Sequence, residues 1–180
     1  MSVMNAVQRL GFECTITDDS EEIRNADKVI LPGVGEASSA MKSLEANGLD
    51  GTIKLLKQPV LGICLGMQLM CSHSEENDTK GLGIFDLMVK RFPATDTVPH
   101  MGWNNLNSVK GKLFTDLTSE DNIYFVHSYY APISKDTIAE CDYILPFSAA
   151  LQKDNFYGTQ FHPEKSGIAG SNILKQFLTL

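Results

Sequence analysis

The chain has little positive charge, few cysteines and no long apolar run. Its 180 residues carry 15 Lys and Arg against 22 Asp and Glu, which gives a formal net charge of −7. That balance argues against a nucleic-acid-binding surface and against a polybasic membrane patch. No apolar run approaches the roughly 18 residues of a membrane span, and no signal peptide is expected. We therefore expect neither a nucleic acid nor a membrane as partner.

The cysteines lack the Cys-x-x-Cys spacing of zinc sites and redox pairs, so both of those interpretations are weak. We expect no metal and no cofactor, and a reducing cytoplasm suits such unpaired thiols best. A hydrophobic content of 43% and a charged content of 21% are ordinary for a globular protein. The length favours one domain over residues 1–180. The four cysteines are Cys14, Cys64, Cys71 and Cys141.

The sequence is organised around residues 59–70, Pro-Val-Leu-Gly-Ile-Cys-Leu-Gly-Met-Gln-Leu-Met. The apolar residues 60–63 predict a buried parallel strand, and residues 65–70 predict a helix. Between them, Gly-Ile-Cys-Leu-Gly at 62–66 is a cysteine counterpart of the Gly-x-Ser-x-Gly nucleophile elbow. A helix N-terminus favours a thiolate over a thiol. Cys64 is therefore a candidate nucleophile, and a buried structural cysteine is the alternative.

The remaining patterns predict an α/β fold. Before the elbow, helical and strand-like stretches alternate, which implies an open, mainly parallel sheet with helices on both faces. After it, a polar surface loop and a series of strand-like runs predict an antiparallel extension. The expected helices are 3–10, 20–26 (capped by Ser20), 36–46, 49–57, 65–70 and 166–178. The expected strands are 12–16, 28–31, 60–63, 84–92, 103–109, 123–130, 138–145, 148–152 and 156–161, with the loop at 72–83.

The first expected element is a helix rather than a strand. In such a fold an N-terminal helix normally returns from a strand, so the pattern predicts that a leading strand is missing from the front. Its absence would expose unpaired strand edges, and we expect a marginally stable or self-associating chain.

A cysteine nucleophile needs a base, and the candidate with the best position is His162. It lies in Gln-Phe-His-Pro-Glu at 160–164, after the last expected strand, where open α/β sheets collect their active sites. In extended geometry Glu164 points to the same side as His162 and can fix its tautomer. A plain strand-end turn is the alternative. The other histidines are His73, His100 and His127.

A tetrahedral intermediate also needs donors for its oxyanion. One is expected from the backbone N–H of Leu65, directly after the nucleophile. The Pro-Gly-Val-Gly loop at 32–35 could supply a second, because its glycines permit backbone angles that aim amides inward. A plain strand-to-helix turn is the alternative for this loop.

Gly-Ile-Cys-Leu-Gly-Met-Gln at 62–68, taken with His-Pro-Glu at 162–164, resembles the triad-type glutamine amidotransferases. These enzymes hydrolyse glutamine and deliver ammonia to a partner synthase. Residues 32–35, 99–104 (Pro-His-Met-Gly-Trp-Asn) and 125–129 (Phe-Val-His-Ser-Tyr) narrow the resemblance. Together they are similar to the family of glutaminase subunits of imidazole glycerol phosphate synthase, which act in histidine biosynthesis. That family usually opens with an apolar strand and an Asp-Tyr-Gly-x-Gly-Asn-like loop, neither of which stands in this chain.

The resemblance implies a glutaminase in which Cys64 is the nucleophile, His162 the acid–base and Glu164 its orienting partner. It also implies that Gly35 and Leu65 line the oxyanion site. The residues that would hold L-glutamine are Gln68, Glu76, Ser128 and Tyr129.

The implied partner is the cyclase subunit of imidazole glycerol phosphate synthase, in a heterodimer. A buried Trp103 in a core strand is the alternative to a role in docking. Two other functions stay open: another cysteine hydrolase on the same scaffold, such as a peptidase or γ-glutamyl hydrolase, and a non-catalytic docking subunit. The residues implied at the docking face are Met101, Trp103, Asn104 and Lys165.

Overall fold

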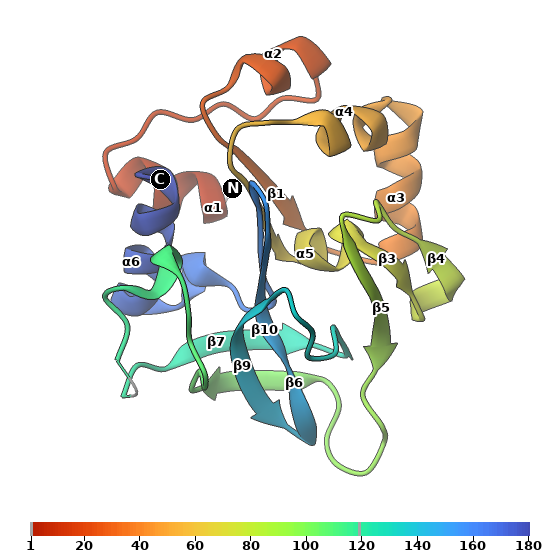
Figure 1. Cartoon of the computed structure of the whole chain (residues 1–180), viewed down its shortest axis with the longest axis vertical. Coiled ribbons are helices and arrows are strands. Elements are labelled where there is room, and N and C mark those ends of the chain that lie inside the picture. Colours follow the sequence, from red (N-terminus) through yellow and green to blue (C-terminus); the bar gives the residue numbers. More distant parts are fainter. Residues whose placement is uncertain (1, 119) are drawn as a thin grey trace.

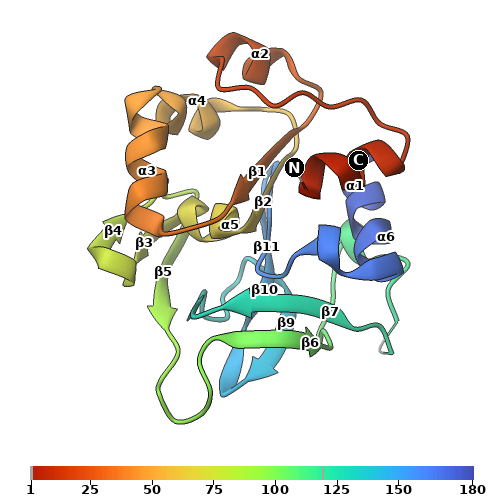
Figure 2. The same cartoon turned by 180° about the vertical axis from the view of Figure 1, so that it is seen from behind.

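The structure is a computed structural model that describes residues 2–118 and 120–180 (Figures 1 and 2). The first three strands of its main sheet run parallel, and the last two are antiparallel additions. This order confirms the predicted open, mainly parallel sheet with an antiparallel extension. The five strands, in spatial order, are β1 (Val29–Gly33), β2 (Val60–Cys64), β11 (Phe156–Thr159), β10 (Leu145–Lys153) and β9 (Thr137–Tyr143).

Strand β2 is paired on both sides, and its side chains alternate between two hydrophobic cores. Leu61 and Ile63 pack into one core, whereas Val60 packs with Met67 into the other. A strand buried on both faces reads as a continuous apolar run, which is the pattern in the sequence. One face is covered by α1 (Ser2–Arg9) and α6 (Gly167–Leu178), and the other by α3 (Ala37–Ala46), α4 (Leu49–Leu55) and α5 (Leu65–Met70) (Figure 2).

Two smaller sheets account for the other described strands. The first is mixed, and the second is a simple antiparallel pair. None of the helices in the described ranges is long and apolar enough to cross a membrane. The first sheet has the order β4 (Thr79–Lys80), β3 (Cys71–Ser74), β5 (Phe85–Arg91) and β8 (Tyr129–Tyr130), and the second pairs β6 (His100–Asn104) with β7 (Ile123–His127). The remaining helices are α2 (Ser20–Asn25), η1 (Glu76–Asp78), η2 (Lys112–Phe114) and η3 (Pro163–Lys165).

Two strand predictions and one loop prediction were wrong. Residues 12–16 run without regular structure, because no described strand pairs with them and alternation alone does not make a strand. Residues 72–83 are not simply a loop, since β3 pairs in parallel with β5 and β4 folds back on β3. The strand expected at 103–109 begins earlier, at His100, and ends at Asn104.

The cap of α2 was also misplaced. Its N-cap is Asp19, not Ser20, because Asp19 Oδ1 accepts hydrogen bonds from the backbone N–H groups of Glu21 and Glu22.

Among the described residues, strand β1 forms one edge of the main sheet. The absence of a leading strand, and the marginal stability or self-association expected from it, stay predictions.

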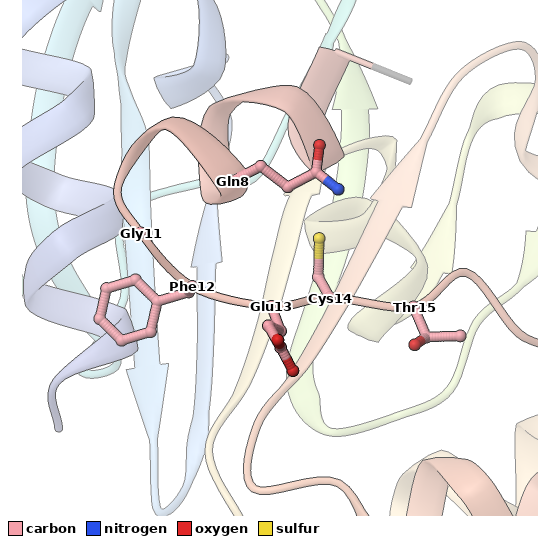
Figure 3. A pocket seen from close by; sticks show the side chains of 6 residues that line it. All are labelled: Gln8, Gly11, Phe12, Glu13, Cys14 and Thr15. Carbon is pink, nitrogen blue, oxygen red and sulfur yellow. The ribbon is translucent and has the colours of Figure 1, made fainter.

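An open cavity of about 490 Å³ lies where α1 meets the segment that follows it (Figure 3). The Cys14 side chain points toward Gln8 there, and its Sγ lies 3.8 Å from the carbonyl oxygen of Met4. None of the predicted site residues lines this cavity. The lining residues are Gln8, Gly11, Phe12, Glu13, Cys14 and Thr15.

Helix α5 sits unusually close to the strands beneath it, and this approach depends on glycine. A Cβ added at Gly66 would overlap the carbonyl oxygen of Leu31 on β1. A Cβ added at Gly62 would come within 2.7 Å of the backbone nitrogen of Met67. Both contacts involve backbone, which cannot move aside like the end of a flexible side chain. The two glycines of the Gly-x-Cys-x-Gly motif are thus required by packing as well as by the turn.

We expect Gly66→Ala to destabilise the protein by about 2 kcal/mol or more, because overpacking against backbone strains a well-packed core. The matched control is Gly51→Ala in α4, where an added Cβ meets nothing within 4 Å. That control should be neutral or slightly stabilising, since alanine has the higher helix propensity. Urea unfolding followed by circular dichroism measures both. Equal midpoints for the two variants would contradict the packing argument.

Candidate active site

Cys64 occupies the junction of β2 and α5 in a backbone conformation that few non-glycine residues adopt. Its φ is 53° and its ψ is −109°, and it is the N-cap residue of α5. A residue held in this region is strained, and such strain clusters at functional sites. The geometry is that of a nucleophile elbow, in which a sharp strand-to-helix turn presents the side chain at the sheet edge.

His162 and Glu164 form a buried pair. Nδ1 of His162 lies 2.9 Å from Oε1 of Glu164, and the two side chains are 8% and 3% exposed. Oε2 of Glu164 is buried and has no partner among the described residues. Ser166 fixes the backbone here, because its hydroxyl donates to the carbonyl oxygen of His162 at 2.7 Å and accepts the N–H of Tyr124. The imidazole is therefore held in a defined orientation.

The His162 ring also hydrogen-bonds with Cys64, and this contact contributes to its pKa. Burial lowers this pKa, but hydrogen bonds and charge attraction from Cys64 and Glu164 outweigh burial and raise it to about 9. His162 is consequently protonated at neutral pH. An imidazolium and a helix N-terminus both stabilise an anion on the Cys64 sulfur. The three predicted catalytic residues are brought together.

The loop at 32–35 starts beside the nucleophile, because Gly33 is the register partner of Cys64 between β1 and β2. Gly35 has a φ of +95°, a conformation that favours glycine. Leu65, whose N–H was the expected first donor, is the first residue of α5. Both expected oxyanion donors thus stand at segments that flank Cys64.

Glu76 anchors the far end of this loop rather than contacting Cys64. Its Oε2 accepts a hydrogen bond of 2.8 Å from the backbone N–H of Ala37, at the start of α3. Next to it, the Asn77 amide donates to Oε1 of Glu36, also at 2.8 Å. These two bonds tie η1 to the residues that follow Gly35.

Gln68 lies one helical turn after Cys64 and is buried in a polar chain that reaches the sulfur. Its Nε2 donates to the carbonyl oxygen of Tyr129 at 3.0 Å and to Oε1 of Gln160 at 2.9 Å. Nε2 of Gln160 in turn lies 3.7 Å from Cys64 Sγ. Gln160 was not among the site residues predicted from the sequence. Its spacing of two residues from His162, which places both on the same side of an extended chain, was the available signal.

Ser128 is another residue expected near glutamine, and it lies between β7 and β8. Its carbonyl oxygen accepts the N–H of Phe92 at 3.0 Å. His73 lies in β3, and its Nε2 is 2.8 Å from Oδ1 of Asp78.

Of the residues expected at a docking face, the three on β6 point to alternate sides of the strand. Met101 and Trp103 are 66% and 57% exposed, on the outer side of β6, so a buried Trp103 is wrong. Asn104 points the other way and donates to the carbonyl oxygen of Asp142 at 3.0 Å. Lys165 is exposed, and its Nζ lies 6.0 Å from the ring centre of Tyr124. The Trp103 ring is 5.7 Å from that same ring, so both side chains lie near Tyr124.

The arrangement is suited to acyl transfer through sulfur. An anionic sulfur can attack a carbonyl carbon, an adjacent imidazolium can protonate the leaving group, and backbone N–H groups can stabilise the oxyanion. Within residues 2–118 and 120–180, no group of three or more His, Cys, Asp or Glu side chains is placed to hold a metal ion.

Comparison with known proteins defines the class. The Glutamine amidotransferase class-I family matches residues 1–180, and the chain belongs to this family. It is 59% identical over 182 residues to the imidazole glycerol phosphate synthase subunit HisH of Bacteroides fragilis, across 99% of this chain and 93% of that protein. It is 46% identical over 187 residues to the subunit of the same name from Vibrio parahaemolyticus, across 99% and 92% of the two chains.

Solved structures agree on the fold. A putative GMP synthase protein from Thermoplasma acidophilum superposes with a TM-score of 0.75 at 21% identity, over 99% of this chain and 85% of that one. A further glutamine amidotransferase gives a TM-score of 0.76 at 18% identity, over 99% and 91%. At such identities the likeness concerns the fold alone, and it confirms the predicted fold class.

We expect Glu164→Gln to lower the pKa of His162 from about 9 toward its ordinary value of 6.5, because the variant removes the negative charge that favours the imidazolium. Since folding raises this pKa, the protonated ring stabilises the fold fully below pH 6.5. That contribution is lost as the pH rises through about 9. The variant should therefore show a flatter decline of unfolding free energy over this window.

NMR titration of the His162 ring and urea unfolding at several pH values measure these two effects. Glu45→Gln, at an exposed position of α3, is the control that removes a charge without touching the pair. An unchanged His162 titration in Glu164→Gln would contradict the geometry described.

Proposed function

We propose that this chain is a glutaminase subunit that hydrolyses L-glutamine to glutamate and ammonia. The ammonia passes to a cyclase subunit for imidazole glycerol phosphate synthesis in histidine biosynthesis. The observation that carries the proposal is Cys64 in its strained elbow with the His162–Glu164 pair against it. Membership of the amidotransferase family and the high identity to subunits named HisH support the same conclusion.

In the proposed reaction the Cys64 thiolate attacks the side-chain amide carbon of glutamine and forms a tetrahedral intermediate. His162, protonated at neutral pH, gives its proton to the amide nitrogen. The C–N bond breaks, ammonia leaves and a thioester remains. His162, now neutral, accepts a proton from water as the water attacks the thioester. The intermediate expels the Cys64 thiolate, the new γ-carboxyl group releases its proton to solvent as glutamate leaves, and the thiolate and the imidazolium are restored.

We assign the remaining roles by resemblance to the amidotransferase family. The N–H groups of Leu65 and Gly35 stabilise the oxyanion, and Glu164 orients His162. Gln68, Ser128 and Tyr129 hold the α-amino and carboxylate ends of glutamine. Glu76 contributes by fixing the loop that carries Gly35, through its bond to the start of α3.

The cyclase subunit docks on the outer side of β6. Met101 and Trp103 are large apolar side chains exposed side by side on one strand, and such residues are frequent anchors of protein interfaces. Lys165 contributes to the same face, because its Nζ and the Trp103 ring both lie near the Tyr124 ring, and it directly follows Glu164 in the sequence. Asn104 supports the strand from its inner side. We propose a cytoplasmic location, where the four cysteines stay reduced as they are in this structure.

Cys64→Ala should abolish glutamine hydrolysis while leaving thermal unfolding nearly unchanged, because it removes the nucleophile without opening a large cavity. Ammonia release from glutamine, with and without the cyclase subunit, measures the effect. Cys14→Ala is the matched control, since Cys14 lies at a separate cavity and should leave the rate intact.

Hydrolysis that survives in Cys64→Ala would overturn the assignment. A wild-type protein that cleaves γ-glutamyl peptides but not glutamine would favour a different cysteine hydrolase. A wild-type protein that binds the cyclase without any hydrolysis would favour a docking subunit.

Trp103→Ala should weaken cyclase binding by about 2 kcal/mol, the scale of an interface hot spot, and change unfolding little because the side chain is half exposed. Isothermal titration calorimetry with the cyclase subunit measures the affinity. Met88→Ala is the control, an exposed apolar residue on β5 in a different sheet, and should bind normally. Normal binding by Trp103→Ala would remove the docking assignment.

A further inference from the structure

Two buried histidines that the proposed reaction does not use lie on the paired strands β6 and β7. His100 and His127 are register partners across β6 and β7, and they are 4% and 6% exposed. Nδ1 of His100 is 3.1 Å from Nε2 of His127. At this distance one of the two buried nitrogens must carry a proton and donate it in a hydrogen bond, and the other must accept.

The positions of the protons follow from the partners. Nδ1 of His127 is 2.8 Å from the carbonyl oxygen of Tyr129, which can only accept, so this nitrogen carries a proton. In a neutral ring Nε2 of His127 is then an acceptor, and Nδ1 of His100 must be the donor. Nε2 of His100 is left to accept, and it faces the amide nitrogen of Asn104 at 3.4 Å. All donors in the relay run in one direction, from Asn104 to Tyr129.

The surroundings favour this neutral, single arrangement. Burial lowers the pKa of His100 to about 4. Burial lowers the pKa of His127 to about 3 despite its bond to Tyr129, with the charges of His100 and His162 acting in the same direction. The His100 ring is stacked between Tyr143 at 4.0 Å and Phe125 at 4.8 Å, so it cannot turn freely. Neither ring carries a charge at neutral pH, and each has one compatible tautomer.

The relay ends on a group that belongs to the candidate pocket. The Tyr129 carbonyl oxygen also accepts from Gln68, whose second N–H goes to Gln160. Gln160 in turn reaches the sulfur of Cys64. A continuous path of hydrogen bonds thus joins the strand that exposes Met101 and Trp103 to the residues around the nucleophile.

We propose that His100 and His127 are positioning residues: in these tautomers they hold the Tyr129 carbonyl toward Gln68 and so set the wall of the glutamine pocket. The proposal rests on the proposed glutaminase function. It assigns the imidazoles no proton transfer to substrate. It predicts that removing the donor on His100 disturbs the pocket even when the ring stack is kept.

His100→Phe and His100→Asn are the matched variants for this test. Phenylalanine keeps a stacked ring but leaves Nε2 of His127 without its donor, which frees His127 to change tautomer. Asparagine keeps an N–H near the Nδ1 position. We expect His100→Phe to raise the KM for glutamine about tenfold, the scale of one lost buried hydrogen bond, with a smaller change in kcat. His100→Asn should restore KM to within about twofold of the wild type.

The kinetics are measured on the complex with the cyclase subunit, and two NMR readouts do not depend on activity. In the wild type, ¹⁵N spectra of the histidine rings should show protonated Nδ1 and unprotonated Nε2 for both residues. The side-chain amide signals of Gln68 should shift in His100→Phe but not in His100→Asn.

A proton on Nε2 of either ring, or Gln68 signals that ignore both variants, would overturn the relay. Equal KM values for wild type and His100→Phe would overturn the positioning role. If the wild-type complex showed no glutaminase activity, the proposed function would be refuted instead. The NMR result would still decide whether the relay exists.

Discussion

The strained junction between β2 and α5 is the constraint on which the rest of the site depends. Cys64 holds a positive φ there, and that conformation persists only because the surrounding structure determines it from several sides. Gly62 and Gly66 allow α5 to lie against the backbone of the sheet. The register of β1 and β2 then places Gly33 opposite Cys64. The position of the nucleophile, the placement of the α5 N-terminus beside it and the position of the 32–35 loop are all consequences of one tight packing arrangement.

The second half of the site comes from the other end of the chain, and buried polar contacts join the two halves. His162 follows β11, which pairs in parallel with β2, so the base and the nucleophile leave neighbouring strands at the same sheet edge. Gln160 spans the gap by bonding both Gln68 and Cys64. Because buried polar groups are costly when unpaired, this network favours one arrangement of the pocket over others. The neutral pair of His100 and His127 extends this hydrogen-bond network to β6.

Local patterns were enough to predict the elements that carry the catalytic groups. The apolar run at 60–63 with its two glycines predicted β2 and the start of α5. The alternation of His162 and Glu164 predicted a pair that the structure holds at 2.9 Å. In both cases the decisive contacts lie within a few residues of each other, where spacing alone sets geometry.

Features that depend on distant pairing could not be predicted in this way. Residues 12–16 have a strand-like composition, but a strand exists only with a partner. Strands β3 and β4 form within a polar stretch because β5 lies alongside. The contact between His100 and His127 needed the register of two strands far apart in the sequence. The contacts of Gln160 with Gln68 and Cys64 likewise join residues far apart in the sequence. The Asn104 side chain turns inward for the same reason.

The central claim is that Cys64 carries the acyl group of glutamine during the reaction. Rapid acid quenching of the wild-type complex during turnover, followed by peptide mass spectrometry, tests it directly. The account predicts a glutamyl thioester on the peptide that contains Cys64, formed and lost at rates consistent with ammonia release. Continued release of ammonia with no adduct, or with the adduct on another residue, would contradict it.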